Sequence, residues 1–254
     1  MKRLILIVLV LLVLPQYTFS QIMNIHLKNG QLEQFRLSEV DSITFGSVTG
    51  TLKWMGRSSV KIKTNEGVVI YIDPYAGDDY AEPADILLVT HGHSDHSNVS
   101  LITKSENCET YIGPHAASVV EGQILAPGDS VVSASGIKIK AVFAYCTNHP
   151  KGECVGFVLD INGIKIYHAG DTDKIDEMAE LEKLHIDYML LQIDGALCMG
   201  PEQAMEAVEV VKPRYAIPVH RARLGASEDE KQENVNRFTS PQRMILDEGD
   251  EIFL

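Results

Sequence analysis

The stretch Thr90-His91-Gly92-His93-Ser94-Asp95-His96 determines how the rest of the chain is interpreted. It begins at the carboxyl end of the apolar, β-branched run 85–90, and that run predicts a buried strand. Side chains alternate along extended backbone, so His91, His93 and Asp95 can face one side, and a small turn can bring His96 to join them. Four metal-ligating side chains within six positions are typical of neither a packed core nor a solvated loop. The stretch therefore predicts a metal site at the carboxyl end of a strand.

Strand patterns dominate on both sides of this stretch, and helical patterns separate them. Two strand-rich halves with helices between them predict a layered α/β sandwich over 47–254. The segment 21–46, with a turn at Asn29-Gly30, predicts a short appended β element. Further strands are expected at 60–63, 68–73, 110–112, 137–144, 155–159, 164–168, 188–193, 215–219 and 244–246. Helices are expected at 97–104, 175–184, 201–211 and 228–238.

Length and charge narrow the classes of function. A chain of 254 residues fits one large domain. Its formal charge is −13, and it becomes −15 if a signal segment carrying Lys2 and Arg3 is removed. A nucleic-acid partner is not expected, because gripping phosphates needs a basic surface. An anionic substrate is compatible, because bound metal ions supply local positive charge.

The first twenty residues read as an export signal. Lys2 and Arg3 form a basic start, 4–14 is an aliphatic run, and 18–20 offers small residues for cleavage. The run is too short to span a bilayer, and no cysteine lies near the cleavage point. We expect a periplasmic or secreted protein with no integral membrane anchor after cleavage. The four cysteines match no zinc-ribbon spacing, and we expect buried free thiols.

The stretch from Thr90 to His96 resembles the His-x-His-x-Asp-His hallmark of the metallo-β-lactamase superfamily. The resemblance continues in order through His149, through Asp171 in Tyr167-His168-Ala169-Gly170-Asp171, and through His220 in Ile217-Pro218-Val219-His220, so it covers about 51–254. It implies a four-layer αββα sandwich. It also implies that one metal ion is held by His91, His93 and His149, a second by Asp95, His96 and His220, and that Asp171 bridges them.

Imidazole and carboxylate ligands suit divalent zinc first, with manganese, iron and nickel also compatible. Two such ions close together lower the pKa of a shared water, so we expect a bridging hydroxide as nucleophile, with Asp95 and Asp171 as the catalytic carboxylates. In the resembled superfamily the bridging aspartate is typical of ester, thioester and phosphodiester hydrolases and atypical of β-lactamases. The expected reaction is hydrolysis of an ester, lactone or phosphodiester in a small molecule or lipid.

Within the superfamily, the chain resembles the branch of ascorbate-6-phosphate lactonase-like and N-acyl-phosphatidylethanolamine phospholipase-like proteins. This rests on Ile72-Asp73-Pro74-Tyr75, the segment 167–173 and Met199-Gly200-Pro201-Glu202. The chain departs from that branch at Arg57, at 194–198 and at Arg221. Those positions border the expected pocket, so the resemblance to that branch does not predict the substrate of this chain.

Several other side chains have two possible roles. Asp73 is either an orienting partner for a ligand histidine or a turn residue. His168 is expected in the core, and His26, His115 and His185 in the core or on the surface. Tyr145, Asn148, Arg221 and Arg223 either line the pocket or pack elsewhere. A metal-dependent binding or sensing protein of the envelope is the alternative function, and the sequence leaves the oligomeric state open.

Overall fold

The computed structural model describes residues 22–26, 32–39, 48–196 and 198–254. The predicted export signal at 1–20 lies outside these residues. The chain divides into two compact units, Met1–Ser47 and Val48–Leu254. In the first unit, β1 (Ile22–His26) pairs antiparallel with β2 (Leu32–Arg36), and a short 3₁₀ turn, η1 (Leu37–Glu39), follows. No helix in the described ranges is both long and apolar enough to cross a membrane.

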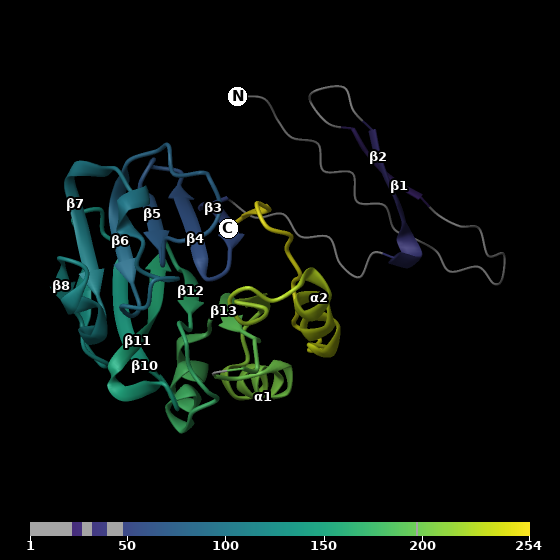
Figure 1. Cartoon of the computed structure of the whole chain (residues 1–254). Helices are drawn as coiled ribbons and strands as arrows, with labels where there is room; N and C mark the ends of the chain where they lie inside the picture. Colours follow the sequence, from purple (N-terminus) through teal and green to yellow (C-terminus); the bar gives the residue numbers. More distant parts are fainter. Residues whose placement is uncertain (1–21, 27–31, 40–47, 197) are drawn as a thin grey trace, which may run out of the picture. The chain divides into compact units, whose positions relative to one another are not determined.

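Two mixed sheets form the second unit (Figure 1). The seven-stranded sheet has the order β15 (Glu251–Phe253), β3 (Gly50–Gly56), β4 (Ser59–Thr64), β5 (Val69–Ile72), β6 (Ala84–Val89), β7 (Lys104–Ile112), β8 (Gln123–Ile124). The six-stranded sheet has the order β14 (Tyr215–Val219), β13 (Tyr188–Gln192), β12 (Ile164–His168), β11 (His149–Ile161), β10 (Lys138–Cys146), β9 (Ser130–Val132). The halves predicted from sequence thus correspond to two sheets.

The largest part of the core lies between the two sheets. In β6, Ile86 and Leu88 face the other sheet, whereas Leu87 and Val89 face outward into a second apolar cluster. β13 alternates in the same way, with Leu190 between the sheets. Both strands are covered on both faces, which explains why their sequences are continuous apolar runs.

Helices cover the outer faces and complete four layers. On the six-stranded sheet these are η4 (Asp176–Leu184), α1 (Pro201–Val211) and α2 (Glu228–Arg237). On the seven-stranded sheet they are two short 3₁₀ helices, η2 (Val99–Leu101) and η3 (Pro114–Ser118). The predicted sandwich is confirmed, with 3₁₀ rather than α-helical segments in the outer layer over the seven-stranded sheet.

Two of the expected elements were wrong. The helix expected at 97–104 is only η2, because β7 begins at Lys104 and pairs in parallel with β6. Sheet hydrogen bonds therefore override the helical periodicity there. The strand expected at 244–246 runs beside β14 but makes only an isolated bridge, between Ala216 and Arg243. The hairpin turning at 65–67 is confirmed between β4 and β5.

Candidate metal centre

The ends of four strands bring the predicted ligands to one place. His91, His93, Asp95 and His96 follow β6, His149 begins β11, Asp171 follows β12 and His220 follows β14. β12, β13 and β14 are parallel, as are β5 and β6, so loops at their carboxyl ends meet at a common edge. All seven residues predicted as ligands are brought together by the structure.

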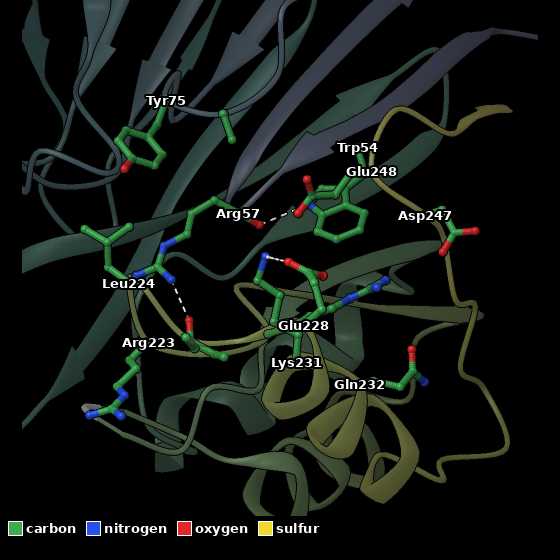
Figure 2. A pocket seen from close by; sticks show the side chains of 15 residues that line it. Trp54, Arg57, Tyr75, Arg223, Leu224, Glu228, Lys231, Gln232, Asp247 and Glu248 are labelled. Carbon is green, nitrogen blue, oxygen red and sulfur yellow. Dashed lines mark hydrogen bonds and ion pairs between the residues drawn. The ribbon is translucent and has the colours of Figure 1, made fainter.

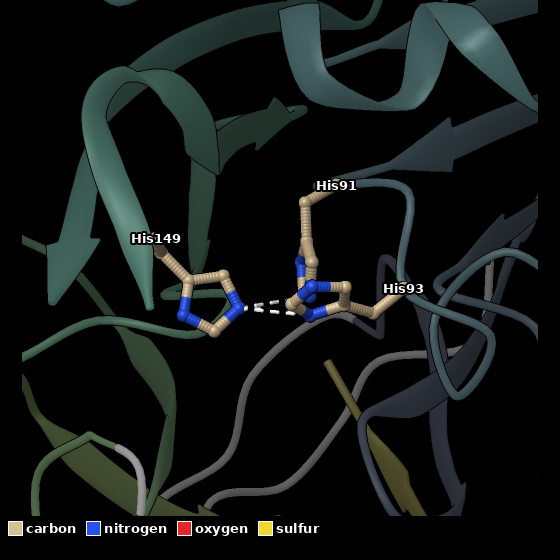
Figure 3. Close-up of side chains that lie close together, drawn as sticks. All are labelled: His91, His93 and His149. Atoms are coloured by element: carbon tan, nitrogen blue, oxygen red, sulfur yellow. Dashed lines mark hydrogen bonds between the residues drawn. The ribbon is translucent and has the colours of Figure 1, made fainter. Parts of the chain in front are cut away.

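His91, His93 and His149 form the first triad (Figure 3). The Nε2 atom of His149 lies 3.3 Å from Nε2 of His91 and 3.1 Å from Nδ1 of His93. Three ring nitrogens therefore converge on one point. Gly92 permits the close turn between the first two histidines, since a Cβ there would lie 2.8 Å from the carbonyl oxygen of His115.

The second triad consists of Asp95, His96 and His220. The Oδ2 atom of Asp95 lies 3.6 Å from Nε2 of His220 and 3.9 Å from Nε2 of His96. Both histidines are buried, and Nε2 of each has no hydrogen-bond partner among the described residues. These two nitrogens therefore have no protein partner and can bind a cation that displaces their protons.

Asp171 lies between the two triads. Its Oδ2 atom is 3.9 Å from Nε2 of His91 and 3.8 Å from Nε2 of His149, which belong to the first triad. The same oxygen is 3.6 Å from Nε2 of His220, and Oδ1 is 3.4 Å from Nε2 of His96, both of the second triad. The carboxylate thus reaches both groups of ligands, as a bridging residue must.

Asp73 orients two of the histidines from behind. Its Oδ1 accepts the Thr90 N–H at 2.7 Å, and its Oδ2 accepts the Thr90 hydroxyl and lies 2.7 Å from Nδ1 of His96. The Thr90 hydroxyl is in turn 3.0 Å from Nδ1 of His91. An acceptor on Nδ1 places the proton there and leaves Nε2 free to bind metal. Of the two roles open for Asp73, the structure supports the orienting one.

His220 is held from two sides. Its Nδ1 lies 3.1 Å from Oδ2 of Asp194, at the end of β13, and its backbone N–H donates to the carbonyl of Arg57 at 2.9 Å. His220 adopts a left-handed backbone conformation, with φ 43°. A non-glycine residue in that region is uncommon and marks a position that the surroundings determine.

The charges of the site are set by burial and by the neighbouring ligands. Burial lowers the pKa of His149 to about 4 and that of His91 well below its usual value. Burial alone would lower the pKa of His96 too, but Asp171 and Asp73 raise it well above its usual value. Burial opposes ionisation of Asp171, yet His220 and His96 hold its pKa well below the ordinary range. Asp171 is therefore a buried carboxylate that needs cationic partners.

The donor set fits divalent cations. Nε2 of His96, Nε2 of His220 and Oδ1 of Asp171 are buried polar atoms without hydrogen-bond partners in the part of the chain that the structure describes. Leaving such groups unpaired is costly unless something binds them. Nitrogen and carboxylate donors in two triads with a shared carboxylate are the ligands expected for zinc and related metals.

A cavity of about 530 Å³ is lined in part by Arg57 and Tyr75 (Figure 2). Arg57 connects the cavity to the second triad, because its guanidinium also binds Asp95. Tyr75 and Leu224 supply apolar surface. The remaining charged side chains have both signs and are Arg221, Arg223, Glu228, Lys231, Asp247 and Glu248. The lining suits a ligand with both apolar and polar groups.

The structure corrects the expectation for the cysteines. Cys146 and Cys198 form a disulfide, so these two are not free thiols. Cys154 is free and buried as expected, whereas Cys108 is free but only half-buried. The sequence spacing gave no signal for the disulfide pair, because the two positions are 52 residues apart and meet only through the loops around the site. The bond lies next to His149.

Other candidate residues are placed as follows. His168 is a buried core residue, and its Nε2 lies 2.8 Å from the carbonyl of Ser58. Arg221 stacks on Trp54, with its guanidinium carbon 4.2 Å from the ring centre, and bonds to backbone carbonyls. His115 is closer to the site than expected, since its ring centre is 5.2 Å from that of His93.

Arg223 and His185 are exposed, whereas Tyr145 donates to Glu177. Arg57 and Asp194 support candidate ligands, and no sequence pattern predicted this role for either residue. Their contacts with Asp95 and His220 join positions that are far apart along the chain.

Comparison with known proteins agrees with this geometry. Residues 51–220 match a model described as the beta-lactamase superfamily domain. A UPF0173 metal-dependent hydrolase of Polynucleobacter asymbioticus is 31% identical over 208 residues, covering 66% of this chain and 73% of that protein. One from Thermococcus onnurineus is 30% identical over 191 residues, covering 66% of this chain and 83% of that protein.

Solved structures give the same fold. A protein of Parabacteroides distasonis described as a metal-dependent hydrolase aligns with a TM-score of 0.68 and 25% identity, over 91% of this chain and 100% of that one. A metallo hydrolase of the archaeon Ignicoccus hospitalis aligns with a TM-score of 0.64 over 81% of this chain and 98% of that one. Its identity of 23% supports likeness of fold alone.

Proposed function

The chain belongs to the metallo-β-lactamase superfamily and is a metal-dependent hydrolase, and from this premise we propose that it works with two metal ions joined by Asp171. The observation that carries the proposal is the position of that carboxylate. Its oxygens lie within 3.9 Å of Nε2 of His91, His96, His149 and His220. A site for one ion would not need a buried carboxylate in reach of both triads.

His91, His93 and His149 would hold one ion, and Asp95, His96 and His220 the other. Divalent ions in such a pair supply Lewis acidity and lower the pKa of water so that it can act as a nucleophile near neutral pH. Zinc is the first choice for this donor set, and manganese, iron and nickel are compatible with it.

The residues of the chain prepare this site in three ways. Asp73 and Thr90 fix the tautomers of His96 and His91 so that Nε2 faces the centre. The carboxylate of Asp194 faces Nδ1 of His220 at 3.1 Å and favours the same orientation. Burial keeps His91 and His149 neutral, which is the form that binds metal.

We propose an ester, lactone or phosphodiester of a small molecule or lipid as the substrate. All three present an oxygen on a carbonyl carbon or a phosphorus atom, where negative charge develops during hydrolysis. Arg57 lines the cavity and donates three hydrogen bonds, two to Asp95 and one to the carbonyl of Ala222. A guanidinium has five N–H donors. The two donors left over can bind a substrate oxygen.

A substrate screen tests the proposal. The purified protein is loaded with zinc or manganese and incubated with bis-p-nitrophenyl phosphate, simple lactones and phospholipids. We expect turnover of at least one class, abolished by a chelator and restored by metal. His185→Asn is the matched control, because this exposed histidine has a left-handed conformation that asparagine tolerates. Metal binding without turnover of any class would favour a binding or sensing protein instead.

Export is a separate part of the proposal. The basic start and the aliphatic run 4–14 support removal of the first twenty residues and release into the periplasm or medium. Fractionation of the native host with sequencing of the mature amino terminus tests this. Full-length protein in the cytoplasm, with Met1 retained, would contradict it.

A further inference from the structure

A disulfide lies directly behind one of the metal-ligating histidines. Cys146 ends β10, three residues before His149, and Cys198 lies between β13 and α1. Their Cα atoms are 5.5 Å apart, which is usual for a disulfide. Cys146 is 9% exposed and Cys198 is 8% exposed, so the bond is nearly buried beside the site.

The sulfur atoms face the outer nitrogen of the His149 ring. Sγ of Cys146 is 3.0 Å from Nδ1, and Sγ of Cys198 is 3.4 Å from the same atom. At the corresponding nitrogen, His91, His96 and His220 each face an oxygen, of Thr90, Asp73 and Asp194 respectively. Sulfur is only a weak hydrogen-bond acceptor. The orientation of His149 therefore depends on where the sulfurs are held rather than on a strong acceptor.

The bond also connects two segments that support different triads. His149 stands in the tight turn between β10 and β11, where Cys146 is its cross-strand partner. Cys198 belongs to the loop that begins at Asp194, whose carboxylate faces His220. The turn and this loop are otherwise distant in sequence, so the covalent bond fixes their separation at the metal site.

We infer that Cys146 and Cys198 are positioning residues for metal binding: their disulfide holds the His149 ring so that Nε2 points at His91 and His93. This inference rests on the proposed use of His149 as a metal ligand. It adds a covalent support to a site in which His91 and His96 are supported by hydrogen bonds to Thr90 and Asp73. Without the bond, the turn can move away from Cys198 and the ring can rotate.

The first measurement asks whether the bond forms in the protein. Denatured protein is alkylated with and without prior reduction and weighed intact. We expect two alkyl groups without reduction, on Cys108 and Cys154, and four after reduction. Four groups without reduction would overturn the inference.

The second measurement compares metal affinities at the first triad alone. The background is His220→Ala, which disables the second triad and isolates the first. In that background, the Cys146→Ser/Cys198→Ser pair should weaken zinc binding about 10- to 100-fold, the range found for residues that orient ligands. It should also change the visible absorption of bound cobalt. Cys108→Ser, which removes a half-buried free thiol in β7, should change neither.

Opening the bond in the unsubstituted chain gives an independent check. A water-soluble phosphine reduces the disulfide. The phosphorus takes the oxygen atom of one water molecule, and the two protons of that water end on the two thiols. Iodoacetamide then blocks the two thiols so that they cannot bind zinc themselves, and the reduced protein treated in this way should show the same loss of zinc affinity, with its circular dichroism and melting recorded beside it. Unchanged affinity in both the serine pair and the reduced protein overturns the inference. If the wild-type chain binds only one ion, the two-metal proposal is contradicted and the inference on the disulfide is not. The comparison of zinc affinities with and without the disulfide would still test how His149 is held.

Discussion

The guanidinium of Arg57 donates two hydrogen bonds to a single oxygen of Asp95, from Nε at 3.0 Å and from Nη2 at 2.6 Å. That oxygen, Oδ2, is the one that faces His96 and His220. The carbonyl of Arg57 also accepts the backbone N–H of His220. One residue at the end of β3 thus supports two ligands of the second triad, through its side chain and its backbone.

Arg57→Ala is therefore expected to weaken the second metal position. The guanidinium repels a nearby cation, but it also fixes the carboxylate and the segment after His220. Residues that orient ligands are typically worth 10- to 100-fold in affinity or activity, and we expect a loss of about that size. Arg57→Lys should recover little of it, because an ammonium cannot make the two-pronged contact. Zinc titration measures the effect, and equal or tighter binding in Arg57→Ala would show that repulsion dominates.

Asp73→Asn should cost both stability and metal affinity. The amide can accept the Thr90 N–H, but its NH₂ group would face the Thr90 hydroxyl or Nδ1 of His96, where the carboxylate now accepts. We expect the free energy of unfolding to fall by about 1–3 kcal/mol, the range for a buried polar group left unpaired. Asparagine tolerates the left-handed backbone at this position, φ 47°, so backbone strain is not the cause. Chemical denaturation measures the change, and unaltered stability would argue against the hydrogen-bond network.

His149→Ala and His220→Ala should each remove about one equivalent of metal. The two histidines belong to different triads, so each variant should keep the ion of the other triad. Elemental analysis after dialysis measures this, and His185→Asn should bind as the wild type does. Loss of both ions in each variant would mean that the triads do not bind independently.

Of the seven candidate ligands, four were predictable from the local pattern alone, and His149, Asp171 and His220 were implied by the resemblance to the metallo-β-lactamase superfamily. Four of them are encoded within six positions, and the others follow or begin strands with recognisable apolar patterns. The supports of those ligands were harder to predict. Arg57 is 38 positions from Asp95, and Asp194 is 26 positions before His220, so neither contact leaves a local pattern.

The fold was predictable from the local patterns of its strands and helices. The prediction failed where local pattern and tertiary pairing disagree. The segment 97–104 has helical periodicity, yet strand pairing of β7 with β6 begins at its end. The Cys146–Cys198 bond depends on two loops meeting, which only the packed sheets decide.

Away from the site, the ion pairs of Asp79 with Lys53 and Lys61 make the stability of the fold depend on pH. Asp79 accepts hydrogen bonds from Lys53 and Lys61, both at 2.8 Å, and these lysines lower the pKa of Asp79. A carboxyl group with a lowered folded-state pKa stabilises the fold above its unfolded pKa, and the effect is lost as pH falls. Asp79 is one-third exposed, so solvent screening limits the contribution to about 1 kcal/mol.

Asp79→Asn should therefore destabilise the fold by about this amount at pH 7 and by progressively less as pH falls below 4. Urea denaturation of both proteins across this range measures the difference. A difference independent of pH would mean that packing, and not charge, accounts for the effect.

The metal content and turnover of Asp171→Ala, measured on one preparation beside the wild type, test the central claim most directly. The wild type should bind two equivalents of metal. Asp171→Ala should bind one or fewer, because the remaining ligands no longer share a carboxylate that offsets the repulsion between two cations. Turnover should fall by about 10²-fold or more, equal to roughly 2.7 kcal/mol of transition-state stabilisation. Two bound equivalents and near-native turnover in Asp171→Ala would contradict the bridging role and the two-metal mechanism built on it.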